Sequence, residues 1–270
     1  MPIFANYAYA HGTEPITLLF LRFTLASAMM LIYSMFRHAR FPKGPVLIIS
    51  ILMGAIGYAG QSFTYFTALL YAPAGTVAIL LYLYPALVTG FSVLFLKQKI
   101  TRAEIIALIL ALSGTVCVIG LETGGKPLGI ILGVAAAFIY SIYIITGSRI
   151  MPNTDVITTS TIIMMSAGAV YTMGILIRGV QFPAQVAGWS AVGGIVVFST
   201  VIAIVTFFEG LKRIGPVHSS MLSTLEPPVT VALAWIAFDE GMTVTTFIGG
   251  AMILAAGIIL ARKPSRPPLE

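Results

Sequence analysis

Charged residues are scarce in this chain. Asp, Glu, Lys and Arg make up 9% of its 270 residues, whereas hydrophobic residues make up 58%. A soluble domain usually carries about 25% charged residues, so water could not solvate a surface of this composition. The shortage of charge excludes an ordinary soluble protein and predicts an integral membrane protein embedded in a lipid bilayer.

Cysteine is almost absent as well. The single Cys117 cannot form an intrachain disulfide, and a lone cysteine excludes every metal site built on a cysteine cluster. The sequence also lacks a paired intramembrane aspartate, a His-Glu-x-x-His segment and a Gly-x-Ser-x-Gly nucleophile turn. We therefore expect no catalytic residues, no metal and no cofactor, which disfavours an intramembrane lipid-modifying enzyme.

Long apolar runs make up most of the sequence. A run of about 20 apolar residues can cross a bilayer as one helix, because lipid leaves few other ways to satisfy the backbone polar groups. Runs of spanning length lie at residues 16–36, 46–70, 74–95, 105–120, 128–148, 156–177, 189–211, 217–238 and 243–261. The sequence therefore predicts nine full spans in an all-α fold.

Basic residues are confined almost entirely to the loops. When the loops alternate between the two sides of the membrane, twelve of the 15 Lys and Arg residues fall on one side and two on the other, with Arg22 inside a span. The positive-inside rule makes the first side cytoplasmic, and the C-terminus with it. This distribution explains the net charge of +6 without nucleic acid as a partner, and it predicts a multi-pass protein of the bacterial inner (plasma) membrane.

The sequence repeats itself. A shift of 142 residues superposes several pairs: Thr64 on Thr206, Phe66 on Phe208, Pro85 on Pro227, and Thr101 on Thr243. A second match, residues 12–17 with residues 153–158, occurs at a shift of 141. Because a unit of five helices is odd, the second copy must enter the membrane from the opposite side, which is the inverted-repeat plan.

The two copies have unequal lengths in this sequence. The second copy begins with a full helix at 128–148, whereas residues 1–10 are too short to span and lack the features of a signal peptide. We interpret these ten residues as half of a first helix. The expected plan is ten helices in two inverted five-helix repeats, here nine full spans plus a half helix. The repeats are expected at 1–123 and 127–263, followed by a cytoplasmic tail at 264–270.

Four segments carry a resemblance to a known family: Leu21-Arg22-Phe23, Tyr84-Pro85, Leu225-Glu226-Pro227 and Phe238-Asp239-Glu240-Gly241-Met242-Thr243. In this order, and with the internal repeat, they resemble the EamA-type permeases of the drug/metabolite transporter superfamily over essentially the whole chain. The resemblance implies ten helices in two five-helix repeats. Gln98 departs from the family pattern, which usually has a glutamate there, and the missing half of the first helix is a second departure.

Glu226 is the clearest ionisable residue inside a predicted span. A charged group near the middle of a span costs about 2.5–3.5 kcal/mol on insertion scales, so it marks a candidate functional site. Ser219, Ser223, Glu226 and Thr230 are spaced 4, 3 and 4 apart and therefore share one helical face. Glu226 is a candidate substrate or proton site. The alternative is a protonated carboxyl, or a hydrogen bond between helices, without a role in transport.

Arg22 is the second candidate, in the outer third of its span. Its guanidinium could hold a substrate carboxylate or phosphate with two parallel hydrogen bonds. It could equally anchor to backbone carbonyls or to a structural partner, and both interpretations are open.

A stripe of small and polar residues follows one face of the span at 46–70, namely Gly54, Gly57, Gln61, Thr64 and Ala68. The paired positions of the second copy are Ser199, Ala203, Thr206 and Gly210. Small residues let helices approach closely, which explains most of the stripe as packing. Gln61 is more polar than packing needs, so it is a candidate to line a cavity, with packing as the open alternative.

Tyrosines add hydroxyl-bearing rings to the predicted central helices. Tyr84 occupies the position equivalent to Glu226, and Tyr82, Tyr140 and Tyr143 lie in the same group of helices. Aromatic rings with a few polar groups suit amphipathic or aromatic small molecules, although single membrane tyrosines are often interface anchors. The candidate substrate-binding residues are therefore Glu226, Arg22, Gln61, Tyr84, Thr64, Thr206, Ser223 and Tyr140.

Inverted repeats are a common plan among secondary transporters. Together with the resemblance, the repeat predicts an alternating-access transporter of a small metabolite or drug, such as an amino-acid-like, nucleoside-like or amphipathic compound. A monomer or a homodimer would serve. Coupling to protons through Glu226 is a subsidiary hypothesis. The open alternative is a membrane scaffold protein that transports nothing.

Overall fold

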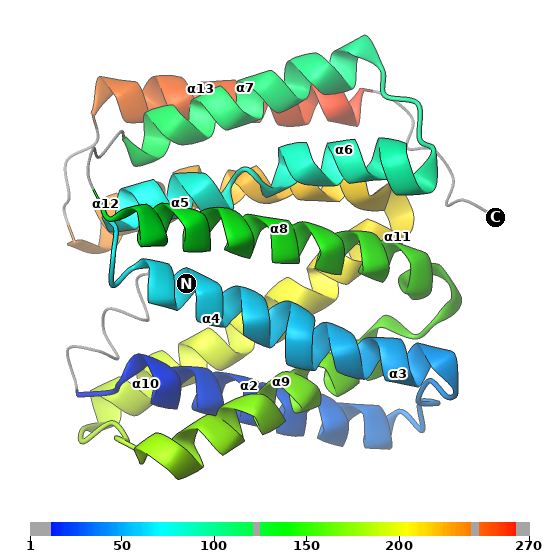
Figure 1. Cartoon of the computed structure of the whole chain (residues 1–270), viewed down its shortest axis with the longest axis vertical. Coiled ribbons are helices and arrows are strands. Elements are labelled where there is room, and N and C mark those ends of the chain that lie inside the picture. Colours follow the sequence, from blue (N-terminus) through cyan, green and yellow to red (C-terminus); the bar gives the residue numbers. More distant parts are fainter. Residues whose placement is uncertain (1–11, 121–124, 239–242, 263–270) are drawn as a thin grey trace. The chain divides into compact units, whose positions relative to one another are not determined.

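The chain is built from helices alone wherever its structure is described. The computed structural model describes residues 12–120, 125–238 and 243–262, and these residues contain no strand (Figure 1). The all-α prediction is confirmed. The expected half helix at 1–10 and the tail at 264–270 lie outside the described residues, as does the motif segment 239–242.

Eight helical stretches in the described residues are long and apolar enough to cross a membrane, whereas the sequence predicts nine spans. The difference comes from one stretch of 48 residues, Val186–Leu233, which covers two predicted spans. These spans meet at Gly215, whose backbone is not helical (φ 77°, ψ 175°) and is followed by Pro216. A positive φ suits glycine, so the chain turns at this position without strain.

The helices form two compact units, and each contains segments from both halves of the sequence. The first unit, residues 1–60 and 149–209, contains α2 (Pro15–Phe36), α3 (Pro45–Leu52), the π-helix η1 (Met53–Tyr58), α9 (Val156–Arg178), α10 (Val186–Val196) and the π-helix η3 (Val197–Ile202). The second unit, residues 61–148 and 210–270, contains α5 (Ala74–Leu81), α6 (Tyr84–Leu96), α7 (Arg102–Ile119), α12 (Glu226–Phe238) and α13 (Val244–Ala261). The boundary between the units runs through three helices: α4 (Ala59–Ala68), α8 (Pro127–Ile150) and α11 (Ala203–Leu222).

In the first unit, α2 packs antiparallel along α9. At one end, the backbone N–H of Gln181 donates to the Thr17 hydroxyl (3.2 Å). At the other end, the Thr158 hydroxyl donates to the carbonyl oxygen of Arg40 (3.3 Å). The start of each helix therefore lies beside the end of the other. The opposite flank of α2 packs against α10 through a buried cluster that includes Leu18, Leu21, Ala191 and Ile195.

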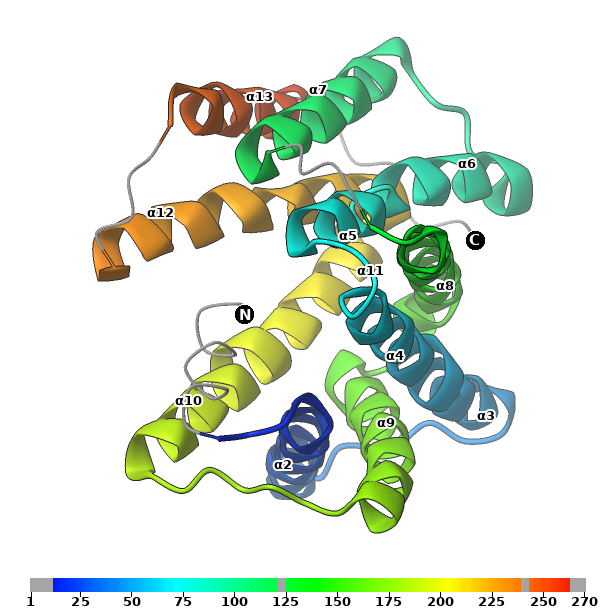
Figure 2. The ribbon, with the colours of Figure 1, turned by 60° about the vertical axis from the view of Figure 1, so that its left-hand side comes forward.

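In the second unit, α7 and α13 form the corresponding antiparallel pair, side by side in both ribbon views (Figures 1 and 2). The two helices approach each other at Gly114 and Gly249, where a Cβ atom on Gly249 would lie 2.5 Å from the carbonyl oxygen of Gly114. Only glycine permits this separation. Thr101 and Thr243, a pair matched by the internal repeat, cap the first turns of α7 and α13 through their hydroxyls.

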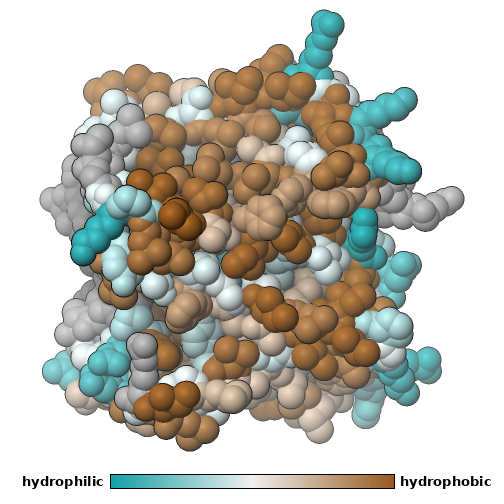
Figure 3. Space-filling view, viewed as in Figure 1, coloured by the Kyte–Doolittle hydropathy of each residue, from teal (hydrophilic) through white to brown (hydrophobic). Residues whose placement is uncertain are grey.

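Many large hydrophobic side chains point away from the helix packing. Phe36, Leu176 and Ile177 are each at least 80% exposed. Exposure of such side chains to water would be unfavourable, whereas exposure to the hydrocarbon of a bilayer is not. Figure 3 shows hydrophobic side chains over the flanks of the helices and hydrophilic side chains gathered near their ends. This distribution matches a protein that lipid surrounds along the length of its helices.

Replacing either glycine of the α7–α13 contact should destabilise the protein. We expect Gly114→Ala or Gly249→Ala to cost about 1–3 kcal/mol, because the added methyl group must push two backbones apart. Thermal unfolding of the purified protein in detergent measures the effect. The matched control is Gly90→Ala in α6, where a Cβ meets nothing within 4 Å and alanine favours the helix. Equal midpoints for Gly114→Ala and Gly90→Ala would contradict the close approach.

Candidate substrate site

Two helices of the second unit are interrupted at matching positions. The first helix stops at Leu81 and resumes at Tyr84 as α6, and the second passes through a 3₁₀ turn before Glu226 begins α12. Tyr84 and Glu226 are equivalent at the shift of 142 residues. The proline that follows each of them lacks a backbone N–H and fits only the first turn of a helix, so both copies break the same helix at the same place.

The second break presents the Glu226 carboxylate to tyrosine hydroxyls. The hydroxyl of Tyr82 donates to Oε2 of Glu226 (3.3 Å), and the carboxylate acts electrostatically on Tyr65 and Tyr84 as well. Glu226 itself is exposed. As the first residue of α12 it faces the positive end of the helix dipole, which stabilises a negative charge there.

Aromatic rings continue this arrangement away from the carboxylate. The Tyr84 ring is buried, and its hydroxyl donates to the Ser220 carbonyl oxygen (3.4 Å). Tyr140 meets the Tyr84 ring edge to face, with centroids 4.8 Å apart. Glu226, Tyr65, Tyr82, Tyr84 and Tyr140 are called the Glu226–tyrosine cluster below. The structure thus brings together four of the predicted residues, Glu226, Tyr84, Tyr140 and Ser223, and adds Tyr65, which no pattern in the sequence marks.

The remaining predicted polar residues bond to their own helices. The Thr64 hydroxyl donates to the carbonyl oxygen of Gln61 (2.9 Å), that of Ser223 to Ser219 (2.9 Å), and that of Thr206 to Ile202 (2.7 Å). The side-chain oxygen of Gln61 accepts a long hydrogen bond from Ser62 (3.5 Å). Ser223 also lies beside the Tyr84 hydroxyl, which joins it to the cluster. Substrate contact by Gln61, Thr64 and Thr206 stays a prediction.

Arg22 lies in the first unit, where it is 5% exposed. Its Nε donates to the Thr200 hydroxyl (2.8 Å), and one terminal nitrogen donates to the Tyr58 hydroxyl (2.7 Å). The same nitrogen donates to the carbonyl oxygen of Ser199 (3.5 Å), and the guanidinium carbon lies 5.1 Å from the centre of the Phe23 ring. The guanidinium therefore joins α2 to two other helices.

Both partner hydroxyls of Arg22 belong to π-helices. Tyr58 ends η1 and Thr200 lies within η3, and the two residues are equivalent at the shift of 142. Single π-helical turns inside α-helices are rare and occur frequently at functional sites. No pattern in the sequence marks Tyr58 or Thr200 as a partner of Arg22. The repeat alignment pairs them, but it contains no sign that Arg22 reaches both.

The two sites offer different chemistry. The Glu226–tyrosine cluster combines a carboxylate, phenolic hydroxyls and aromatic faces, all of which attract an ammonium group. The Arg22 site has a guanidinium whose contacts include neutral oxygens and aromatic rings. The cluster can recognise a cation, and Arg22 can attract an anion or hold the two π-helices in place.

Comparison with known proteins identifies the family. The family described as the EamA-like transporter family matches residues 1–120 and, a second time, residues 127–262. The chain belongs to the EamA-like transporter family. The resemblance noted in the sequence is thereby confirmed, and the chain is an integral, multi-pass membrane protein of a family of transporters.

This EamA-like protein has relatives in bacteria. It is similar to the uncharacterized transporter YyaM of Bacillus subtilis, with 26% identity over 92% of this chain and 84% of the relative. It is also similar to the aromatic amino acid exporter YddG of Ancylobacter novellus, with 26% identity over 78% of this chain and 76% of the relative. A solved crystal structure, 23% identical, superposes with a TM-score of 0.82 over 94% of this chain and 90% of the other, which shows a shared fold.

Removing a hydroxyl beside Arg22 should destabilise the first unit. We expect Thr200→Val or Tyr58→Phe to cost about 1.5–3 kcal/mol, because each removes a hydrogen-bond acceptor from the buried guanidinium. The midpoint of thermal unfolding in detergent measures the loss. Tyr33→Phe is the control, since Tyr33 is 51% exposed on the same helix as Arg22. If all three variants unfold at the wild-type temperature, Arg22 does not hold these segments together.

Proposed function

We propose that this EamA-like protein is a secondary transporter of small metabolites that carry an ammonium group, such as amino acids and related amines. The observation that carries the proposal is the Glu226 carboxylate, which begins α12 at a helix break and accepts a hydrogen bond from Tyr82. Discontinuous helices form the substrate sites of many secondary transporters.

The chemistry of the cluster favours an ammonium group over a neutral sugar or an anion. The carboxylate supplies a charge-assisted hydrogen bond, and the faces of Tyr82, Tyr84 and Tyr140 supply cation–π attraction and contact for an apolar side chain. The relative from Ancylobacter novellus is named as an exporter of aromatic amino acids, which supports the same class of substrate.

An alternating-access cycle fits a ten-helix plan of two inverted five-helix repeats. Three observations support this plan: the family matches the chain twice, the two helix breaks are equivalent, and the helix pairs α2–α9 and α7–α13 are antiparallel partners from opposite halves. Equivalent helices of opposite direction are what an inverted repeat requires. The excess of basic residues in the loops of one side supports a cytoplasmic C-terminus in this plan.

Transport by the purified full chain in proteoliposomes tests the proposal. We expect counterflow of radiolabelled phenylalanine or tyrosine, and we expect Glu226→Gln to reduce its rate at least about tenfold, because the amide removes the negative charge that the ammonium needs. The control is Glu14→Gln, an exposed carboxylate that caps no helix through its side chain. Wild-type rates in Glu226→Gln would reject the cluster as the ammonium site. A wild-type protein that moves no amino acid, nucleoside, sugar or amine would favour the scaffold alternative.

Proton coupling through Glu226 makes a separate prediction. A carboxylate that binds either a proton or the ammonium exchanges one for the other, so an imposed pH gradient should change the rate of transport by the wild type. In Glu226→Gln the residual transport should be indifferent to the gradient, since glutamine carries no proton at this site. Measurement at equal and unequal pH across the vesicle separates the cases. A gradient response of equal size in the variant would contradict coupling at this residue.

A further inference from the structure

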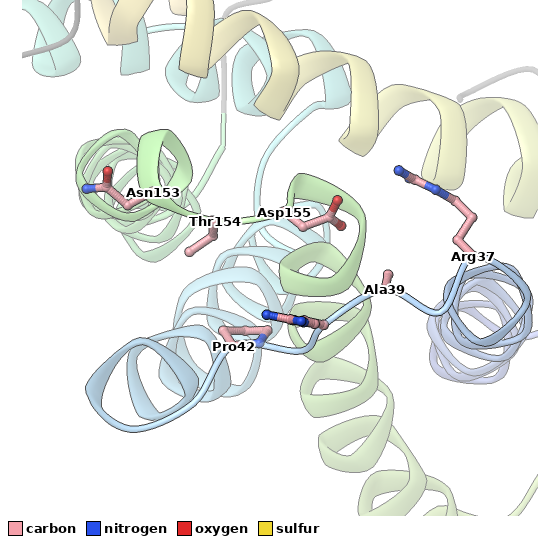
Figure 4. Close-up of a pocket in the computed structure, with 7 residues that line it drawn as sticks. Arg37, Ala39, Pro42, Asn153, Thr154 and Asp155 are labelled. Carbon is pink, nitrogen blue, oxygen red and sulfur yellow. The ribbon is translucent and has the colours of Figure 1, made fainter.

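A pocket of about 360 Å³ opens in the first unit where α2 ends and α9 begins. Arg37 and Arg40 line it from the loop after α2, and Asn153, Thr154 and Asp155 line it from the turn before α9. Figure 4 shows the side chains of Arg37 and Asp155 extending toward the same space. The pocket shares no residue with the Glu226–tyrosine cluster or with the Arg22 site, so it is a separate candidate binding site.

Both arginines of this pocket are available to a ligand. Within the described part of the chain, neither guanidinium donates a hydrogen bond or forms an ion pair, and Arg37 lies over the Tyr33 ring with its guanidinium carbon 5.7 Å from the centroid. The Asp155 carboxylate, in contrast, already accepts a hydrogen bond from the backbone of its own helix. Its Oδ1 accepts the backbone N–H of Thr158 (2.9 Å) and caps the first turn of α9.

Hydrogen bonds hold the loop in the shape that forms the pocket. The Thr158 hydroxyl donates to the Arg40 carbonyl oxygen (3.3 Å), and the backbone N–H of Ala39 donates to the carbonyl oxygen of Ser34 (3.0 Å). A ligand therefore need not order this backbone when it binds, which lowers the entropic cost of binding.

The charge of the lining suits a monoanion. Arg37 and Arg40 each contribute +1 and Asp155 contributes −1, so the lining carries a net charge of +1. A phosphodiester carries a single negative charge, whereas a phosphomonoester carries about −1.5 to −2 at neutral pH. Guanidinium groups form paired hydrogen bonds with phosphate oxygens, so either arginine can bind a phosphodiester, whose single charge balances the net charge of the lining.

The surroundings of the pocket suit a lipid. Met35 and Phe36, the residues just before Arg37, are 64% and 83% exposed on a helix that spans the membrane. Acyl chains attached to a phosphodiester in the pocket would lie along these apolar side chains. We infer that the pocket binds the headgroup of an anionic phospholipid, with the phosphodiester between Arg37 and Arg40. Basic pockets between transmembrane helices are a known setting for anionic lipid headgroups.

Thermal unfolding of the purified full chain in detergent, with added ligand, tests the inference. Phosphatidylglycerol should raise the unfolding midpoint in a concentration-dependent way, because a ligand that binds only the folded state stabilises it. Phosphatidylcholine, whose headgroup has no net charge, and inorganic phosphate at the same concentrations should leave the midpoint unchanged. An equal shift with inorganic phosphate would overturn the lipid assignment in favour of a free anion.

Variants of the two arginines test whether phosphatidylglycerol binds at this pocket. Arg37→Gln/Arg40→Gln should weaken the apparent affinity for phosphatidylglycerol at least about tenfold, because hydrogen bonds to charged groups are the strong ones. The control is Arg102→Gln, an exposed arginine at the start of α7 and outside the pocket, which should bind as the wild type does. An unchanged response in the double variant would reject the site.

A third variant changes the preference rather than removing binding. Asparagine serves as a helix N-cap as well as aspartate does, so Asp155→Asn should retain the start of α9 while raising the lining charge from +1 to +2. We expect this variant to bind phosphatidic acid, a phosphomonoester, several times more tightly than the wild type does. A merely structural role for Asp155 would not produce this gain. Absence of the gain would overturn the charge-matching argument even if the double arginine variant failed to fold.

Discussion

A backbone N–H or C=O group in hydrocarbon has no water to bond with, so a transmembrane helix is interrupted only where other groups replace the lost hydrogen bonds. In this chain the interrupted or π-helical segments carry the candidate site residues or their hydrogen-bond partners. Tyr84 and Glu226 each begin the segment after a break, and Arg22 reaches hydroxyls on two π-helices. The breaks set the directions in which these side chains point, because a continuous α-helix would orient the same side chains differently.

Hydroxyl side chains inside the membrane must also find a hydrogen-bond partner within the protein. A polar residue in a span is therefore not, by its polarity alone, evidence of a substrate site. The hydroxyls of Ser50, Thr89, Thr115 and Thr161 each donate to the carbonyl oxygen four residues earlier in their own helix. Such residues are satisfied without a ligand or a second helix. The hydrogen bond between Tyr82 and Glu226 is different, because it joins the break after α5 to the first residue of α12 and leaves the rest of the carboxylate open to a ligand.

Hydropathy predicted the spans because it depends on averages over many residues, so errors at single positions cancel, whereas the resemblance to the family rested on the order of four short segments and on the internal repeat. The repeat also predicted that Tyr84 and Glu226 are equivalent. The partners of Arg22 could not be predicted. Tyr58 and Thr200 lie 36 and 178 residues away in sequence, and a π-helix adds a residue to a turn, which changes the side chains that face inward without any marker in the sequence.

The two halves duplicate the backbone plan but not the charges. In the sequence repeat, Glu226 is equivalent to Tyr84 at the shift of 142, and Arg22 is equivalent to Ile163 at the shift of 141. Each of these charges therefore occurs in one copy only. Both helix breaks lie in the same unit, where Tyr84 and Glu226 interact. Two carboxylates at these positions would repel each other and would require two cations for balance. One carboxylate with a neutral hydroxyl opposite it balances a single positive charge, which is the charge of the ammonium group that the proposed substrates carry.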